Sequence, residues 1–287
     1  MALDLTVIVL TLNEEKNISA CLTSVKKIAK EIVLVDSFST DRTVDIAQEL
    51  GARVIKNVFK NYSDQRNFAL RKTQIQTEWV LFLDADEKVS VDLSREIVAV
   101  LDSRPRENGY YVCRKVFLQR RWIRRGYYGT RILRLVRVKF AKWGERAINE
   151  KLEVEGETGV LRTDLIHEDL NGIDRWHMKH LKYAELEALE YLKEIKRTSS
   201  RTDLPFLKRW IYFRIWNNLP LFIRPWVYFF YRYILRGGFL DGWQGAGYHF
   251  FQALWFQYLI SYKIKEIQTD RVLSDSIASK PANGEGL

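Results

Sequence analysis

Apolar runs and amphipathic stretches alternate over the first hundred residues of the chain. Short apolar runs bounded by polar residues are typical of buried strands, and they predict strands at residues 5–10, 31–36, 52–55 and 79–83. Apolar residues at helical spacing, together with one polar segment of similar length, predict helices at residues 18–28, 44–50 and 63–72. Strands that alternate with helices indicate βαβ units. The predicted fold class is therefore α/β with a mostly parallel sheet.

Polar residues directly follow three of the predicted strands. They occupy residues 11–15, 36–41 and 84–87. In parallel sheets, ligands bind beyond the carboxyl ends of the strands. The sequence therefore predicts a binding site built from these three segments.

The chain changes character in its second half. Residues 109–155 read as irregular strand rich in arginine, and residues 181–195 read as one face of an amphipathic helix. More than half of the chain's aromatic residues then lie between Phe206 and Tyr262, interspersed with lysine and arginine. This composition marks the segment from about Pro205 as distinct from the α/β part.

The aromatic and basic segment favours a membrane surface. Aromatic bodies bury in the headgroup zone while guanidinium groups reach lipid phosphates, so we expect interfacial helices here, with Arg224 and Arg232 among the contacting cations. An ordinary helical subdomain or an oligomer interface is the alternative. A true span over residues 242–262 is disfavoured, because this uncharged stretch contains glutamines, glycines and a histidine.

Net charge indicates the kind of partner, and cysteine content indicates the type of scaffold and the compartment. The chain has 287 residues, a net charge of +10 and a pI of about 9.4, which indicates an anionic partner such as a nucleotide, a phosphorylated substrate, nucleic acid or an anionic membrane. Its two cysteines, Cys21 and Cys113, exclude a disulfide scaffold and a four-thiolate zinc site, and they fit a reducing compartment. The start of the sequence is expected to be the first strand rather than a signal peptide.

Candidate chemistry concentrates at Asp84 and Asp86, which end the fourth predicted strand. Two carboxylates one residue apart can both reach one Mg²⁺ or Mn²⁺ ion, or one can take a ribose hydroxyl instead. Asp36 ends the second strand, where it can accept hydrogen bonds from a base or a ribose, or form a turn. Dinucleotide binding is disfavoured, because residues 11–15 replace the glycine-rich turn that it requires.

Four motifs carry a family resemblance. In chain order they are VIVLTLNEEKNI, IVLVDSFSTDRT, YSDQRNFAL and WVLFLDADEKVS. Together they resemble glycosyltransferase family 2 over residues 3–102, which implies the GT-A fold, a nucleotide-sugar donor and inverting transfer. Residues 131–167 and the glycine-rich run 237–245 resemble the branch that includes lipopolysaccharide-core β-1,4-glucosyltransferase-like proteins.

The resemblance implies a role for each matching position. It assigns nucleotide-sugar binding to Thr11, Asn13, Glu15, Asp36, Arg66 and Asp84. It makes Asp86 the ligand of Mn²⁺ or Mg²⁺. His167 is a candidate further ligand or diphosphate donor, with a structural histidine as the alternative. Glu150 matches the base position, although Asn149 stands where many branch members have histidine. Arg131 and Arg134 are candidates for a diphosphate or an acceptor phosphate.

The motifs and the composition also predict the domain organisation of the chain. A GT-A catalytic domain is expected over residues 1–170, with a nucleotide-binding half at 1–102 and an acceptor half at 103–170. A helical, membrane-associating region is expected at 171–267 and a flexible tail at 268–287.

The expected activity is inverting transfer of a sugar from a nucleotide-sugar, UDP-hexose first, to a hydroxyl of a lipid-linked or lipopolysaccharide-core saccharide. The enzyme is expected at the cytoplasmic face of the inner membrane, peripheral or monotopic. A polyprenyl-phosphate sugar synthase is the first alternative. A non-catalytic or nucleic-acid-binding protein is a remote one, and nucleic acid is not an expected partner, since no RNA-binding signature is present.

Overall fold

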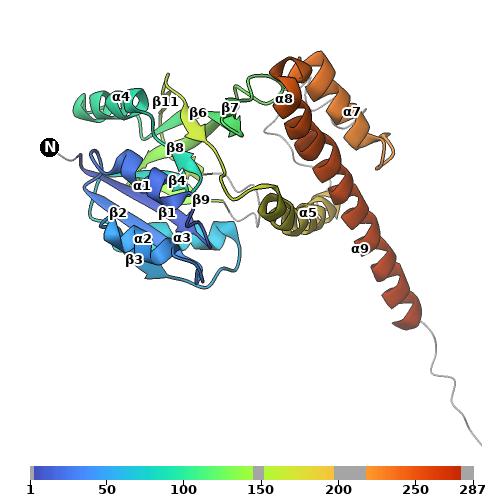
Figure 1. Ribbon diagram of the computed structural model, residues 1–287. Helices are drawn as coiled ribbons and strands as arrows, with labels where there is room; N and C mark the ends of the chain where they lie inside the picture. The colour runs from blue at the N-terminus through green and yellow to red at the C-terminus, as the bar shows by residue number, and fades with distance from the viewer. Residues whose placement is uncertain (1–2, 145–151, 197–217, 279–287) are drawn as a thin grey trace, which may run out of the picture.

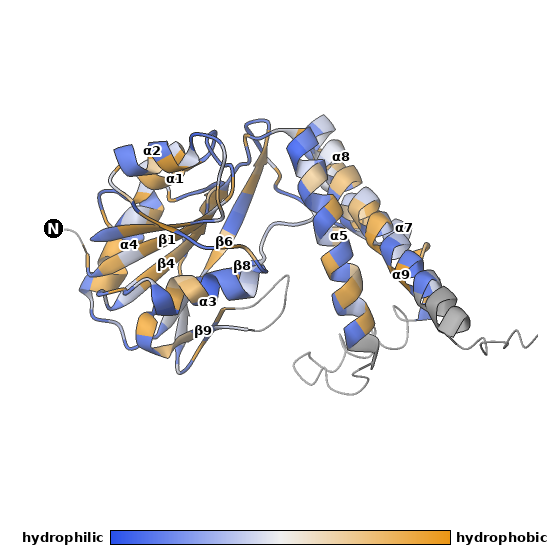
Figure 2. Cartoon of the chain, turned by 90° about the horizontal axis from the view of Figure 1, so that it is seen from below, coloured by the Kyte–Doolittle hydropathy of each residue, from blue (hydrophilic) through white to orange (hydrophobic). Residues whose placement is uncertain are grey.

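The computed structural model describes residues 3–144, 152–196 and 218–278 (Figure 1). An α/β part built from the first half of the chain lies on one side, and a group of long helices lies on the other. Helix α5 (Ile173–Lys196) lies between the sheet and the remaining helices in both ribbon views (Figures 1 and 2). The two parts therefore meet along this helix.

The first four major strands form a parallel sheet in the order β3-β2-β1-β4. Their bounds are β1 Leu5–Thr11, β2 Glu31–Asp36, β3 Arg53–Lys56 and β4 Trp79–Asp84. The helices between them are α1 Ile18–Val25, α2 Thr43–Glu49 and α3 Tyr62–Lys72. These elements confirm the strands and helices expected in this part of the sequence. The strand ends meet at one edge, where the three polar segments follow.

Beyond β4 the sheet becomes mixed. Strand β8 (Arg131–Arg137) pairs antiparallel with β4, β6 (Gly109–Leu118) pairs antiparallel with β8, and β12 (Leu165–His167) runs parallel to β6. The short β5 (Glu87–Lys88) pairs antiparallel with β12 and sets His167 opposite Glu87. The other elements here are α4 Val91–Asp102, β7 Arg121–Trp122, β9 Ala141–Trp143, β10 Leu152–Val154 and β11 Thr158–Val160.

The sheet is buried on both faces. One cluster packs residues such as Val7 and Val9 of β1 against Leu22 of α1 and Ile97 of α4. The other cluster packs the opposite face of the sheet against α3 and Trp143. Side chains alternate across a strand, so β1 supplies both clusters and reads as a continuous apolar run. Its polar end therefore emerges from a rigid, doubly covered strand.

The helical part consists of short and long helical segments in sequence. They are α7 Arg224–Phe230, the π-helical turn η3 Tyr231–Leu235, the 3₁₀ turn η4 Gly238–Asp241, α8 Gly242–His249, the π-helical segment η5 Phe250–Trp255 and α9 Phe256–Ala278. Helix α9 packs along α5 through Ala188, Leu192 and Ile264. Within the described ranges, no helix is both long enough and apolar enough to cross a bilayer.

One expectation for this part is corrected. Helix α9 continues to Ala278, so a flexible tail does not begin at Gln268. The first proline or glycine after Gln268 is Pro281, so nothing in the sequence breaks the helix earlier.

Arg224 and Arg232 both make internal contacts. Arg224 donates to the Leu219 carbonyl and the Tyr191 hydroxyl, and Arg232 donates to the Gly126 carbonyl. Their contact with lipid phosphates stays a prediction.

The glycine-rich run, residues 237–245, lets the neighbouring helical segments pack closely. A Cβ on Gly238 would lie 2.5 Å from the ring of His249, which is fully buried, and a Cβ on Gly245 would lie 2.5 Å from the Gly238 carbonyl oxygen. The run therefore needs glycine for close packing. Asp241, within this run, accepts a hydrogen bond of 2.8 Å from the backbone nitrogen of Arg125. This contact and the one from Arg232 attach the helical part to the loop between β7 and β8.

Candidate functional site

The carboxylate of Asp84 is fixed at the end of β4 by two arginines. Arg66 of α3 donates to Oδ1 at 2.8 Å, and Arg134 of β8 donates to Oδ2 at 2.7 Å. The Arg66 guanidinium in turn lies 4.5 Å from the Trp143 ring centroid. Burial alone would raise the pKa of Asp84, but Arg134 and Arg66 hold it far below its usual range. Asp84 is therefore an ionised acceptor with a set orientation.

Behind Asp84 lies a second, fully buried carboxylate. Glu87 accepts hydrogen bonds from Arg134 at 2.8 Å and from the backbone nitrogen of Asp84 at 2.9 Å, and Arg114 lies 3.5 Å from the same carboxylate. Burial raises the pKa of Glu87, although Arg134 opposes that rise. We name Asp84, Glu87, Arg134 and Arg66 the charge cluster. The cluster fixes the position of Asp84 and thereby the start of the loop after β4.

Asp86 faces His167 on the other side of this loop. Its Oδ1 lies 3.2 Å from His167 Nδ1, and the Asp86 backbone carbonyl accepts from Glu168 at 2.9 Å. Burial alone would raise the pKa of Asp86, but His167 beside it lowers that pKa. Both facing atoms are buried and have no hydrogen-bond partner among the described residues. The pair thus places a carboxylate oxygen and a ring nitrogen, both possible metal ligands, 3.2 Å apart.

This pair fits a divalent cation. Two ligands at about 2.1 Å in adjacent octahedral positions lie about 3.0 Å apart, close to the observed separation. Within residues 3–144, 152–196 and 218–278, no group of three or more His, Cys, Asp or Glu side chains is arranged to hold a metal. Two protein ligands suffice, however, where substrate phosphates and water complete the coordination, as is usual for Mg²⁺.

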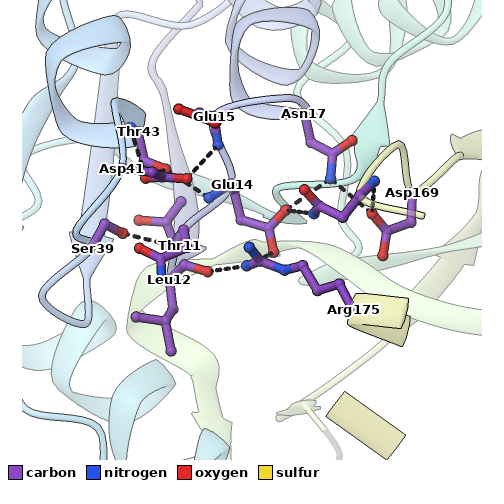
Figure 3. A network of polar contacts seen from close by, with 12 residues as sticks. Thr11, Leu12, Glu14, Glu15, Asn17, Ser39, Asp41, Thr43, Asp169 and Arg175 are labelled. Atoms are coloured by element: carbon purple, nitrogen blue, oxygen red, sulfur yellow. Dashed lines mark hydrogen bonds and ion pairs between the residues drawn. The ribbon is translucent and has the colours of Figure 1, made fainter. Parts of the chain in front are cut away.

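The loop after β1 is held by the loop after β2 (Figure 3). Asn13 has a left-handed backbone conformation, with φ 55°. Its side-chain Oδ1 accepts from the Thr40 backbone nitrogen at 2.7 Å, and its backbone nitrogen donates to Ser39 Oγ at 2.8 Å. Glu15 accepts from the Arg42 backbone nitrogen at 3.2 Å. These contacts give the loop a fixed shape at the sheet edge.

Asp36 has no exposed surface in this structure. Its carboxylate accepts from Thr11 Oγ1 at 2.9 Å and from the backbone nitrogen of Ser39 at 2.8 Å. These contacts match the alternative in which Asp36 forms a turn. A direct contact between Asp36 and a nucleobase requires the Ser39 turn to open, and it stays a prediction.

A network at Glu14 escaped the sequence reasoning. Glu14 accepts from the side-chain amides of Asn17 and Asn171, both at 2.8 Å, and Arg175 donates to the Leu12 carbonyl (Figure 3). Asn17 is a local partner, but Asn171 and Arg175 lie 157 and 163 positions from the residues they contact, so no local pattern joins them. The available signal was the polar run after β12, residues 167–172, which has no other reason to follow a buried strand.

The structure thus brings together some of the candidates and separates others. Those that share the sheet edge at the end of β4 are Arg66, Asp84, Asp86, Arg134 and His167. Arg131 is exposed, whereas Arg134 is buried in the charge cluster, and the assignment of either arginine to a phosphate stays a prediction. Glu150 lies outside the described residues. The strands that flank it in the sequence are β9 and β10, which pair through Trp143 and Leu152.

Comparison with known proteins identifies the family of this chain. The family model described as glycosyl transferase family 2 matches residues 6–163. An uncharacterised glycosyltransferase of Rickettsia bellii is 28% identical over 204 residues, covering 67% of this chain and 69% of that protein. The lipopolysaccharide core biosynthesis glycosyltransferase LpsC of Rhizobium meliloti is 28% identical over 270 residues, covering 88% of this chain and 91% of its own.

Solved structures also align with the chain. Glucosyl-3-phosphoglycerate synthase from Mycobacterium tuberculosis, in complex with Mn²⁺, UDP and glucosyl-3-phosphoglycerate, aligns with a TM-score of 0.31 and 25% identity over 39% of this chain and 43% of its own. S. aureus TarS 1–349 aligns with a TM-score of 0.45 and 17% identity over 94% of this chain and 92% of its own.

The family match covers more than half of the chain, so this protein belongs to glycosyltransferase family 2. Its fold is GT-A, with a helical C-terminal region, and it is a glycosyltransferase enzyme. The expectations of fold and enzyme class are confirmed.

Proposed function

We propose that the protein transfers a sugar with inversion from a nucleotide-sugar, UDP-hexose first, to a hydroxyl of a lipopolysaccharide-core or lipid-linked saccharide. The observation that carries the donor side is the loop after β4, where Asp84 is held ionised and Asp86 faces His167 at 3.2 Å. The similarity to LpsC over most of both chains supports the class of acceptor.

Each residue of the loop has a separate task in this proposal. Asp84 accepts a hydrogen bond from a ribose hydroxyl, because Arg66 and Arg134 fix its orientation. Asp86 and His167 hold a Mn²⁺ or Mg²⁺ ion. When bound, the ion supplies positive charge to the diphosphate oxygens as the sugar leaves. Because the charge cluster fixes Asp84, ribose binding and ion binding fall to different residues of the loop.

The acceptor side requires a base. A hydroxyl is a poor nucleophile, and attack on the anomeric carbon passes through an oxocarbenium-like state, so a carboxylate that takes the proton speeds the step. We assign this task to Glu150. Strands β9 and β10, which border residue 150 on either side in the sequence, support the assignment. They pair with each other, and Trp143 of β9 lies against Arg66, which binds Asp84.

Glu150→Gln is expected to lower the rate of sugar transfer about 10²- to 10⁴-fold, because the base is lost while donor binding is not. The measurement compares transfer rate with donor affinity in the same preparation. Glu153→Gln is the matched control, since Glu153 is exposed and pairs only with Lys142 among its described neighbours. A phosphate acceptor needs little help from a base, so an unaffected Glu150→Gln enzyme would favour the polyprenyl-phosphate alternative.

Donor identity is tested directly. Purified protein with Mn²⁺ or Mg²⁺ is incubated with a panel of UDP-, GDP- and ADP-sugars, and nucleoside diphosphate release is followed. Consumption of one donor supports the proposal and names its nucleotide. Failure to consume or bind any of them, in the presence of candidate acceptors, removes it.

We further propose that the helical part docks on an anionic membrane surface. Large apolar side chains are exposed along it, including Trp226 at 56%, Phe230 at 54% and Trp243 at 65% of their full accessibility. Trp226 and Phe230 lie one turn apart on α7, so they present one face. Exposed aromatic groups on a basic protein suit the headgroup zone.

Trp226→Ser combined with Phe230→Ser is expected to weaken sedimentation with phosphatidylglycerol vesicles by about tenfold or more, because each ring contributes buried apolar area. Val91→Ser combined with Val160→Ser is the control, since these exposed residues lie on the α/β part. Unchanged vesicle binding by the aromatic variant would contradict docking through this face. Concentration-dependent dimers without vesicle binding would identify an oligomer interface instead.

A further inference from the structure

One face of helix α5 lies across the candidate donor site. Arg175, Lys179 and Tyr183 follow one another at four-residue spacing, so they share a face of the helix. Arg175 donates to the Leu12 carbonyl and lies 3.4 Å from Glu14. This end of the face therefore closes on the loop after β1.

The other end of the face contacts helix α3. The hydroxyls of Tyr183 and Tyr62 lie 2.5 Å apart, and their rings meet edge to face with centroids 5.8 Å apart. Tyr62 begins α3, the helix that also carries Arg66. The α5 face thus runs from the loop after β1 to the helix that orients Asp84.

Lys179 lies midway along this face. Its ammonium lies 5.8 Å from the Tyr183 ring centroid, but within the described part of the chain it makes no hydrogen bond or ion pair, unlike the residues one turn before and after it. Burial lowers the pKa of Lys179, but Tyr183 and Asp86 hold it well above the ordinary value. Lys179 is thus a half-buried cation on the same face of α5 as Arg175 and Tyr183.

Helix α5 is held in this position from behind. Trp176 stacks on His180 with centroids 3.5 Å apart, His180 meets Phe256 at 4.8 Å, and His177 meets Trp255 at 4.7 Å. Ala188 and Leu192 pack against α9. The side of α5 that carries these residues is therefore packed against η5 and α9.

We propose that Lys179 binds a phosphate oxygen of the donor diphosphate, so that α5 completes the donor site from outside the family core. The helix begins at Ile173, beyond the matched residues 6–163. The Lys179 ammonium has three N–H donors and makes no hydrogen bond within the described part of the chain, so it can donate to a phosphate oxygen placed between it and the loop after β4. The leaving diphosphate gains negative charge during transfer, which the ammonium stabilises. This inference rests on the proposed function.

The test is calorimetric binding of the nucleoside diphosphate and of the corresponding nucleoside, both with Mn²⁺. UDP, GDP and ADP are first titrated into the wild-type protein to choose the nucleotide. Lys179→Gln is expected to weaken diphosphate binding about 10- to 100-fold and to leave nucleoside binding unchanged, because only the phosphate contact is lost. Lys179→Arg is expected to restore most of the affinity.

Lys182→Gln is the matched control, since Lys182 is exposed on the same helix and carries the same charge. Equal diphosphate affinity for Lys179→Gln and wild type would overturn the inference while leaving the proposed function intact. Equal weakening of nucleoside and diphosphate, together with a lower melting temperature, would also overturn it and make Lys179 structural. Failure of the wild type to bind any of the three diphosphates would remove the proposed function itself.

Discussion

Replacing Asp86 with asparagine is expected to lower metal-dependent sugar transfer by about 10³-fold, because the buried carboxylate that faces His167 loses its charge. The side chain keeps its size, and the backbone contact from Glu168 to the Asp86 carbonyl does not involve the carboxylate. Folding is therefore expected to survive while the ion site fails. Initial rates of nucleoside diphosphate release with Mn²⁺ measure the effect.

A second readout separates ion binding from catalysis. The electron paramagnetic resonance signal of free Mn²⁺, recorded with and without UDP, reports how much ion the protein holds. Asp92→Asn is the matched control, since Asp92 is exposed on α4 and pairs only with Arg95 among its described neighbours. Wild-type Mn²⁺ binding by Asp86→Asn, with a rate reduced less than tenfold, would show that this carboxylate does not hold the ion.

Local pattern was enough to predict the parallel half of the sheet and the position of Asp84 and Asp86. Each strand in that half is a short apolar run, and the polar residues that follow must lie at the same sheet edge. His167 was also a candidate before its neighbour was known. Its place opposite Asp86 depends on the antiparallel pairing of β5 with β12, which unites residues 80 positions apart.

Contacts between distant segments could not be predicted in this way. The charge cluster arises because β8 pairs antiparallel with β4, and this brings Arg134 to Asp84 and Glu87. Sequence reasoning treated Arg134 as a free phosphate ligand, since an arginine on a basic strand gives no sign of buried acids behind it. The contact of Arg175 with the loop after β1 has the same origin in helix docking.

Arg134→Met is expected to lower the free energy of unfolding by about 3–5 kcal/mol, because it leaves two carboxylates without their shared cation. Glu87 is fully buried, so its remaining charge is poorly solvated, and Asp84 keeps only Arg66 and the exposed part of its surface. Urea denaturation measures the loss. Arg95→Met is the control, since Arg95 is an exposed arginine paired with the exposed Asp92.

The pH dependence of this loss follows from Asp84. Arg134 first, then Arg66, counters burial and depresses the pKa of Asp84 in the folded state, so this ion pair stabilises the fold above the unfolded value of about 3.9. That contribution is lost as pH falls from about 4 toward the folded pKa, so the gap between wild type and Arg134→Met should narrow in acid.

Adding Glu87→Gln to Arg134→Met should recover part of the stability, because the second buried charge is then removed with its partner. If Arg134→Met costs no more than Arg95→Met, and the double variant is no more stable than Arg134→Met alone, the charge cluster does not stabilise the fold. Its other three side chains would then matter only for holding Asp84 in place.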